Sequence, residues 1–212
     1  QDKRFISKFA VYHQRYSTNT FPTWSLAQPF RVIAHNGEIN TLKGNKNWMS
    51  AHEPRMNHSS FASTIEDLKP IIDKTASDSA ALDATIELLV RSKRNLPMAK
   101  LLTIPEAFAH RRDFPKKLKD LYTYANAVME SWDGPAAICG FHDEWAIAGM
   151  DRNGLRPLRY TLTNDFLIAG SETGMVEIDE SSIIERGRVG PGQMIAVNFK
   201  EGKFFKDKEI KN

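Results

Sequence analysis

The sequence predicts an α+β fold in which helices cover one face of an antiparallel sheet. Two segments with helical periodicity occupy the middle of the chain, and after residue 135 the pattern changes to short β-favouring runs. Turn-forming residues separate these runs, as expected for antiparallel hairpins. The chain has 212 residues, of which 41% are hydrophobic; this allows a real core and excludes a disordered chain.

The N-terminal part is expected to contain two buried strands and one helix. Residues 9–13 and 30–35 favour β-structure, and the segment between them is rich in Thr, Pro, Asn and Ser. A loop of that length inside a compact domain is often functional. Residues 41–52 suggest a helix, although Gly44 weakens the pattern.

Two longer helices have recognisable ends. Ser77 or Ser79 is a good N-cap for the first, whose apolar residues recur on one face until residues 95–97 end it with Asn and Pro. Pro115 begins the second, in which apolar residues recur at three- and four-residue steps as far as Trp132.

The C-terminal part is predicted to form an antiparallel meander. The expected strands cover residues 136–141, 144–150, 158–162, 166–169, 193–199 and 203–205. Their separators carry turn chemistry, as in Asn153-Gly154 and Glu201-Gly202.

Composition excludes several classes of function. The net charge is only +3 and there is no long basic stripe, so nucleic acid is a poor candidate as partner. The apolar stretches fall well short of the roughly 18 residues that a membrane span needs. The single cysteine, Cys139, cannot form an internal disulfide, and no Cys/His spacing fits a metal site, which favours a reducing compartment, the cytoplasm.

A first polar cluster, residues 15–19, follows the first predicted strand. Arg15 can bind a carboxylate through two hydrogen bonds, and Thr18 and Asn19 can fill the remaining lone pairs of that carboxylate. This cluster indicates a small anionic ligand. Arg15 could also be an ordinary surface charge.

Two further clusters complete a site for an α-amino acid. Asn36 and Gly37 offer an amide side chain beside a backbone N–H, the two donors of an oxyanion hole. Asp78 lies at a predicted helix start and can bind a ligand ammonium group. Asn-Gly is also a common turn signal, and Ser-Asp-Ser is also a common helix cap, so spacing alone does not decide between these interpretations.

Six strings of residues resemble the glutamine amidotransferase domain of the glutamate synthase large subunit. They are residues 11–20, 25–30, 34–41, 78–83, 132–136 and 149–157, and the resemblance runs from about Phe9 to Val197. Shorter forms of two of these motifs occur in all class II, N-terminal nucleophile amidotransferases. The strings at 25–30 and 34–41 are specific to glutamate synthase.

The resemblance implies a fold and a set of roles. The fold is a four-layer αββα sandwich of antiparallel sheets, incomplete in this chain because its first strands would precede Gln1. Arg15 and Thr18 would bind the α-carboxylate of glutamine, with Asn19 as a further donor, and Asp78 would bind the α-amino group. Asn36 and the Gly37 N–H would hold the oxyanion. The motif at 151–157 would be mainly architectural, with Gly154 supplying a turn.

The nucleophile of the family is an N-terminal cysteine whose own α-amino group acts as the base. Residue 1 of this chain is Gln, and Cys139 lies in an apolar run where a structural role is expected. The resemblance therefore implies that this chain is the C-terminal part of the domain and is inactive alone. Its partners would be the segment with the N-terminal cysteine and the synthase domain.

The parent enzyme would hydrolyse L-glutamine and transfer the ammonia to 2-oxoglutarate. FMN and an iron–sulfur cluster would belong to the rest of the parent, with none in this segment, and a reductase subunit or ferredoxin would supply electrons. Two alternatives remain open from the sequence: a non-catalytic amidotransferase-like binding module, and part of another class II amidotransferase.

Overall fold

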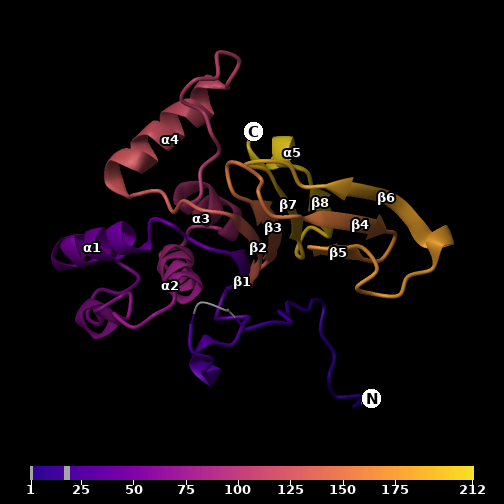
Figure 1. Cartoon of the computed structure of the whole chain (residues 1–212), viewed down its shortest axis with the longest axis horizontal. Coiled ribbons are helices and arrows are strands. Elements are labelled where there is room, and N and C mark those ends of the chain that lie inside the picture. The colour runs from indigo at the N-terminus through magenta and orange to yellow at the C-terminus, as the bar shows by residue number, and fades with distance from the viewer. Residues whose placement is uncertain (1, 17–19) are drawn as a thin grey trace.

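Residues 2–16 and 20–212 are described by the computed structural model, which contains two antiparallel sheets and a group of helices (Figure 1). The helices are α1 (Leu42–His52), α2 (Asp78–Arg91), α3 (Leu96–Thr103), α4 (Lys116–Val128) and α5 (Asp207–Ile210). The strands are β1 (Ile33–Gly37), β2 (Ala136–His142), β3 (Trp145–Met150), β4 (Arg159–Thr163), β5 (Leu167–Gly170), β6 (Ile183–Arg188), β7 (Met194–Asn198) and β8 (Lys203–Phe205).

The strands divide between two sheets. One sheet has the order β1-β2-β3-β7-β8 and the other has the order β5-β4-β6, and all neighbours are antiparallel. The chain leaves the first sheet after β3, builds the second, and returns through β7. The single meander expected from the strand pattern is therefore wrong in its connectivity, whereas the two antiparallel sheets implied by the resemblance are confirmed.

Two hydrophobic cores define the layers. The first lies between the helices and the five-stranded sheet, where Leu82 of α2 packs with Ile33 and Ile138 of β1 and β2. The second joins Ile195 of β7 to Tyr160 of β4, so the two sheets pack face to face. Figure 1 shows α1 to α4 on one side and β4 to β6 on the other. These layers are three of the four in the expected αββα sandwich and confirm the predicted α+β class.

The helix α2 starts where the sequence predicts, and the residues expected to end it begin another helix. Ser77 is the N-cap, and its hydroxyl accepts a hydrogen bond from the Ala80 N–H at 3.1 Å. Asn95 in turn caps α3 by accepting from Met98 N–H, and Pro97 lies in the first turn of α3. The helix α3 was not predicted, although a capping Asn followed by Pro is a helix-start signal.

Other predicted elements also differ from the structure. Residues 9–13 form no strand; the ring of Phe9 packs on that of Phe141, with centroids 3.6 Å apart, without joining the ladder. The second long helix ends at Val128, and Trp132 lies beyond it, buried, with its N–H bonded to the Thr103 carbonyl. The apolar periodicity at Trp132 therefore reflects the burial of this residue and not a continuation of the helix. The strand β6 and the short helix α5 were not predicted.

Strand β1 begins at Ile33, later than the sequence suggests, because a buried carboxylate holds the residues before it. Asp83 of α2 is 3% exposed, and its two oxygens accept hydrogen bonds from the N–H groups of Arg31, Val32 and Ile33 at 3.1, 2.9 and 2.8 Å. Burial raises the pKa of Asp83, and the three N–H bonds oppose that change. The carboxylate therefore fixes how β1 enters the sheet.

The exit of β1 depends on close backbone contacts with the segment before β2. A Cβ on Gly37 would lie 1.8 Å from the Pro135 carbonyl oxygen, and a Cβ on Gly134 would lie 2.0 Å from the Glu38 carbonyl oxygen. Gly134 also has a φ of +148°, which L-residues with a side chain rarely adopt. Both positions thus require glycine for space, and Gly134 requires it for conformation as well.

The close backbone contact at Gly134 predicts that alanine lowers the free energy of unfolding there and raises it at an uncrowded glycine. Gly134→Ala is expected to lower the free energy of unfolding by about 1–3 kcal/mol because of backbone strain and the clash with Glu38. Gly44→Ala is the matched control: a Cβ there meets nothing within 4 Å, and the change within a helix should add about 0.5–1 kcal/mol. Denaturant unfolding of both variants measures the difference, and equal effects would contradict the close-contact argument.

Candidate functional site

The candidate oxyanion-hole residues lie at the exit of β1, which is an edge strand. Phe141 N–H donates to the Val32 carbonyl and Glu38 N–H donates to the Pro135 carbonyl, at 3.0 and 2.8 Å. Because hydrogen-bonded and non-bonded pairs alternate in an antiparallel ladder, Gly37, which faces Ala136, is in a non-bonded pair. The N–H of Gly37 therefore points away from β2, toward the open edge of the sheet.

The same edge of β1 is covered at its earlier positions. The Gln28 side chain accepts from the His35 N–H at 2.6 Å and donates to the His35 carbonyl at 3.0 Å, as a neighbouring strand would. Asp83 covers the Ile33 N–H. Gly37 is the next residue along that edge. The string at residues 25–30, which contains Gln28, resembles glutamate synthase, but the two hydrogen bonds between Gln28 and the His35 backbone were not predicted.

The exit of β1 is tied to the N-terminus of α2. The Asp78 carboxylate accepts a hydrogen bond from the Ile39 N–H at 2.8 Å, and the imidazole Nδ1 of His35 lies 2.7 Å from the Ser79 hydroxyl oxygen. These contacts bring the second and third sequence clusters together. A carboxylate at this position is also stabilised by the positive end of the helix dipole.

His35 is the buried residue that joins these groups, and sequence analysis gave it no role. Its side chain is 2% exposed, and burial is the main cause that lowers its pKa. Asp78 and the Pro135 carbonyl act in the opposite direction, while Arg156 and His13 add to the lowering of the His35 pKa. Neutral His35 therefore lies among the residues of the predicted site.

Arg15 lies on an exposed segment that forms neither helix nor strand. Its neighbour His13 is close enough to His35 to lower the pKa of that imidazole. Two residues of extended chain span at most about 7 Å, so Arg15 belongs to the same region of the surface. Thr18 and Asn19 lie outside the residues that the structure describes.

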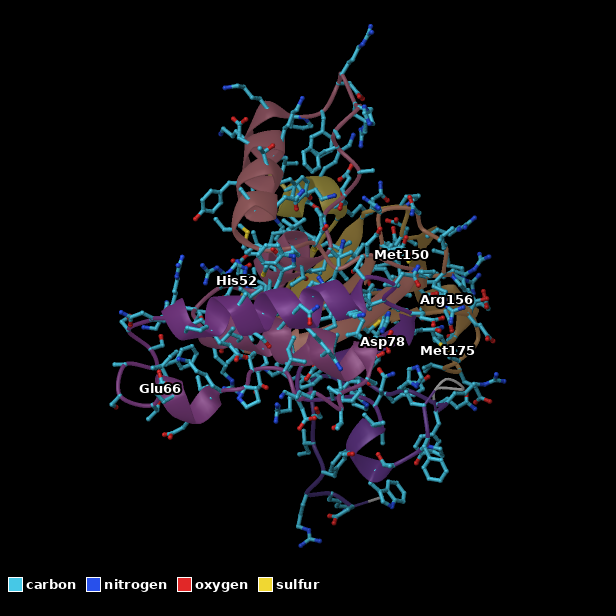
Figure 2. The ribbon with its side chains drawn as sticks, turned by 60° about the vertical axis from the view of Figure 1, so that its left-hand side comes forward. His52, Glu66, Asp78, Met150, Arg156 and Met175 are labelled. Atoms are coloured by element: carbon cyan, nitrogen blue, oxygen red, sulfur yellow. The ribbon has the colours of Figure 1, made fainter. Side chains whose placement is uncertain are left out.

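The side chain of Asn36 has one strong partner. Because side chains alternate along a strand, Asn36 leaves β1 on the face opposite His35. Its Oδ1 accepts a hydrogen bond of 2.6 Å from the Arg156 guanidinium, whose Nε also lies 3.4 Å from the Asn36 carbonyl oxygen. Figure 2 labels Asp78 and Arg156 at the same end of the molecule.

The loop that carries Arg156 is built as the sequence suggests. The buried Asp151 carboxylate accepts hydrogen bonds from the N–H groups of Ala136, Asn153 and Gly154, and Gly154 has a φ of +63°. The architectural interpretation of residues 151–157 is thus confirmed for Asp151 and Gly154. It overlooked Arg156, which reaches from this loop to the candidate site.

Cys139 has the environment of a structural residue. It is half-buried on β2, opposite Ala34 and Ala148, and burial raises the pKa of its thiol to about 11. The thiolate is the nucleophilic form of cysteine, and it is a minor species at neutral pH when the pKa is that high. Cys139 is therefore unsuited to nucleophilic attack.

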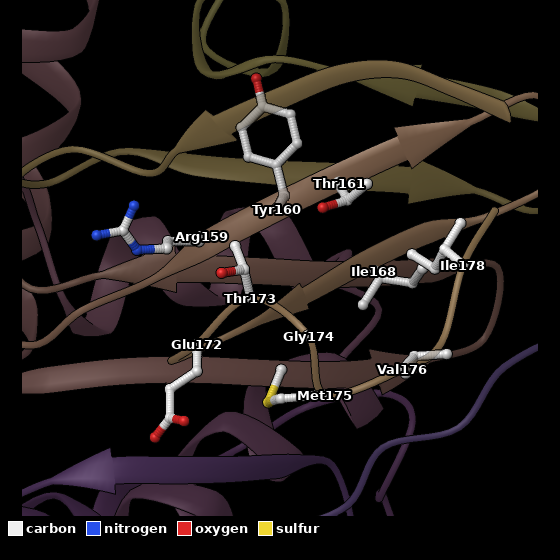
Figure 3. Close-up of a pocket in the computed structure, with 10 residues that line it drawn as sticks. All are labelled: Arg159, Tyr160, Thr161, Ile168, Glu172, Thr173, Gly174, Met175, Val176 and Ile178. Carbon is white, nitrogen blue, oxygen red and sulfur yellow. The ribbon is translucent and has the colours of Figure 1, made fainter. Parts of the chain in front are cut away.

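Two cavities lie away from the exit of β1. A space of about 20 Å³, enough for one water, lies between β4, β5 and residues 172–178 (Figure 3). An open cleft of about 400 Å³ lies between α1 and α4, beside Trp48 and Glu130. Within residues 2–16 and 20–212 there is no group of three or more His, Cys, Asp or Glu that could hold a metal, and no helix there is long and apolar enough to cross a membrane.

Comparisons with known proteins agree on one family. The family model described as "Glutamine amidotransferases class-II" matches residues 1–212. The chain is 57% identical over 212 residues to the glutamate synthase [NADPH] large chain of Azospirillum brasilense and 41% identical over 212 residues to that of Bacillus subtilis. It is 47% identical over 210 residues to the ferredoxin-dependent glutamate synthase of Pyropia yezoensis. The matches cover 98–100% of this chain and 14% of each relative.

Solved structures support the fold. The glutamine phosphoribosylpyrophosphate amidotransferase of Bacillus subtilis has a TM-score of 0.50 and 22% identity, and the match covers 92% of this chain and 34% of that one. A second structure, of an allosteric regulatory enzyme of purine biosynthesis, has a TM-score of 0.51 at the same identity and coverage. At this identity the likeness establishes the fold alone.

The buried, neutral His35 predicts a loss of stability in acid. Its folded pKa is below the ordinary 6.5, so on acidification the unfolded chain binds a proton before the folded chain does, and stability falls below about pH 6.5. His35→Asn keeps a polar group near Ser79 and removes this titration. From about pH 7.5 to about pH 5.5, the variant should lose about 1 kcal/mol less stability than the wild type.

Thermal unfolding of the 212-residue chain across this pH range provides the measurement. His110→Asn, at an exposed position, is the control and should follow the wild-type pH dependence. Identical pH dependence in all three proteins would show that His35 is not protonated on unfolding in this range.

Proposed function

Because the chain belongs to the class-II glutamine amidotransferases, we propose that it forms the glutamine-binding and oxyanion-stabilising part of the glutaminase domain of a glutamate synthase. The high identity to the glutamate synthases of Azospirillum brasilense and Pyropia yezoensis supports this assignment within the family. The observation that carries it is the exit of β1, where the Gly37 N–H faces the open edge and Asp78 lies beside Ile39.

We propose that Arg15 and Thr18 bind the α-carboxylate of glutamine, with Asn19 as an additional donor. A guanidinium forms two parallel hydrogen bonds with a carboxylate, and a hydroxyl fills a remaining lone pair. Asp78 would bind the α-ammonium group through the oxygen that is not engaged by Ile39 N–H. Arg15 and Asp78 would then bind the α-carboxylate and the α-ammonium group, two charges that a free amino acid carries and a residue within a peptide lacks.

In the proposed reaction, a cysteine thiolate attacks the side-chain amide carbon of glutamine. The electron pair of the carbonyl double bond moves to oxygen, and this oxyanion accepts hydrogen bonds from Asn36 Nδ2 and the Gly37 N–H. As the intermediate collapses, the amide nitrogen takes up the proton that the thiol lost, the C–N bond breaks, and ammonia leaves behind an acyl-enzyme. Water then hydrolyses the acyl-enzyme to glutamate and regenerates the thiol.

The nucleophile is proposed to come from an N-terminal cysteine segment outside this chain. The high thiol pKa of Cys139 supports this, since an activated cysteine has a lowered pKa. Ammonia transfer to 2-oxoglutarate, with electrons from a reductase subunit or ferredoxin, would take place in the synthase domain. We propose that FMN and an iron–sulfur cluster also belong outside this chain, because clusters need several cysteine ligands and the sequence has one cysteine.

The oxyanion assignment predicts a loss of turnover from one small change. In the complete protein that carries this chain, Asn36→Ala should lower the kcat of glutamine hydrolysis by about 10²–10³ and leave KM for glutamine nearly unchanged. Asn126→Ala removes an exposed amide on α4 and is the control, with wild-type turnover expected. Ammonia release measures both. Normal turnover of Asn36→Ala would overturn the assignment.

The carboxylate assignment predicts a different kinetic pattern. Arg15→Ala should raise KM for glutamine by about tenfold or more and lower kcat much less, because a ground-state binding contact is lost. Arg4→Ala, at an exposed Arg of the same segment, should leave KM unaltered. Should the Arg15 variant retain the wild-type KM, the carboxylate is bound elsewhere. Failure of the complete protein to release ammonia from glutamine would favour a non-catalytic binding module.

A further inference from the structure

We propose that Arg156 is a positioning residue that orients the Asn36 amide so that its NH2 group points toward the oxyanion. This inference rests on the proposed function, because it concerns the same oxyanion hole. Arg156 lies 120 residues from Asn36 in sequence, on the loop between β3 and β4, and sequence analysis gave it no role in the site.

The direction of the amide follows from the chemistry of the contact. An asparagine side chain has an accepting oxygen and a donating nitrogen at nearly equivalent positions. A guanidinium only donates hydrogen bonds, so the group 2.6 Å from Arg156 must be the Asn36 oxygen. The Nδ2 group is then held on the other branch of the amide, where its hydrogens can donate to a substrate.

The contact does more than select one of two orientations. A hydrogen bond from a cation to the amide oxygen withdraws electron density from the amide and strengthens Nδ2 as a donor. The second contact, from Arg156 Nε to the Asn36 carbonyl at 3.4 Å, uses the fork of the guanidinium and limits its rotation. Lysine has no equivalent fork.

The positive charge of Arg156 also reaches the exit of β1. It is one of the causes that lower the pKa of buried His35, whose ring lies on the opposite face of the strand. The negative charge that develops on the substrate oxygen near Asn36 would be stabilised by the same field. Arg156 therefore has two ways to favour the tetrahedral intermediate over bound glutamine.

Other residues hold the loop in place, so the stability of the fold does not depend on the Arg156 side chain. Asp151 binds the N–H groups of Asn153 and Gly154, and Leu158, two residues after Arg156, is buried between the sheets. The Arg156 side chain is exposed and belongs to none of the hydrophobic core clusters. A substitution there should change the site more than the fold.

Steady-state kinetics of glutamine hydrolysis by the complete protein test this inference. Arg156→Gln should lower kcat by about 10- to 100-fold, the value of one charged hydrogen bond, with KM within about threefold. Arg156→Lys should recover only part of the loss. Added guanidinium chloride should raise the kcat of Arg156→Ala and leave that of the wild type unchanged. The melting temperatures of all variants should match the wild type.

Arg152→Gln is the matched control. Arg152 lies on the same loop, carries the same charge and pairs with Asp133 rather than with Asn36. It should retain turnover within about twofold of the wild type. Equal losses at Arg152 and Arg156 would show a general effect of loop charge and would overturn the inference.

A double substitution separates this inference from the proposed function. If Arg156 acts mainly through Asn36, then Arg156→Ala should slow the Asn36→Ala variant much less than it slows the wild type, and the remaining loss measures the direct effect of its charge. Additive losses would overturn the positioning role. Loss of turnover in Asn36→Ala together with normal turnover in Arg156→Gln would refute this inference and leave the proposed function intact. No loss in either variant would refute both.

Discussion

The candidate site depends on the hydrogen bonds by which helix α2 holds strand β1. Three side chains within six residues of α2 contact the strand or its flanks: Asp83 binds the residues at its entry, Ser79 binds the His35 ring, and Asp78 binds the Ile39 N–H after its exit. An edge strand has N–H groups without strand partners, and buried N–H groups must find acceptors. Helix α2 supplies several of them and so fixes the strand along its whole length.

Buried polar groups in this chain stabilise the backbone, whereas exposed polar groups near the candidate site can contact a ligand. Asp83 and Asp151 are each nearly inaccessible to water, and each carboxylate accepts three backbone hydrogen bonds. Such groups are satisfied within the protein, and removing one would leave unpaired N–H groups inside. Arg15 and Arg156 are exposed and lie outside the helices and strands. Polar groups of this second kind are available to a ligand or to the residue that binds it.

The two packed sheets place this strand exit between two parts of the chain. Residues 77–83 approach β1 from the helix side, and the β3–β4 loop with Arg156 approaches it from the side of the second sheet. A meander in one sheet would have kept that loop far from Asn36. Because β3 is followed by a change of sheet, the loop crosses the end of β1 and can carry a residue to it.

The sequence by itself determined the fold class, a serine cap at 77 or 79, the turns at Gly154 and Gly202 and most strand positions. These features depend on local periodicity and backbone preference. The sequence also singled out Asn36, Gly37 and Asp78 as polar groups at element ends. Only the tertiary structure showed that Gln28 replaces a strand beside His35, that Trp132 is buried outside a helix, and that Arg156 binds Asn36. Each of these contacts joins residues whose proximity depends on how sheets and loops pack, and no local pattern encodes that.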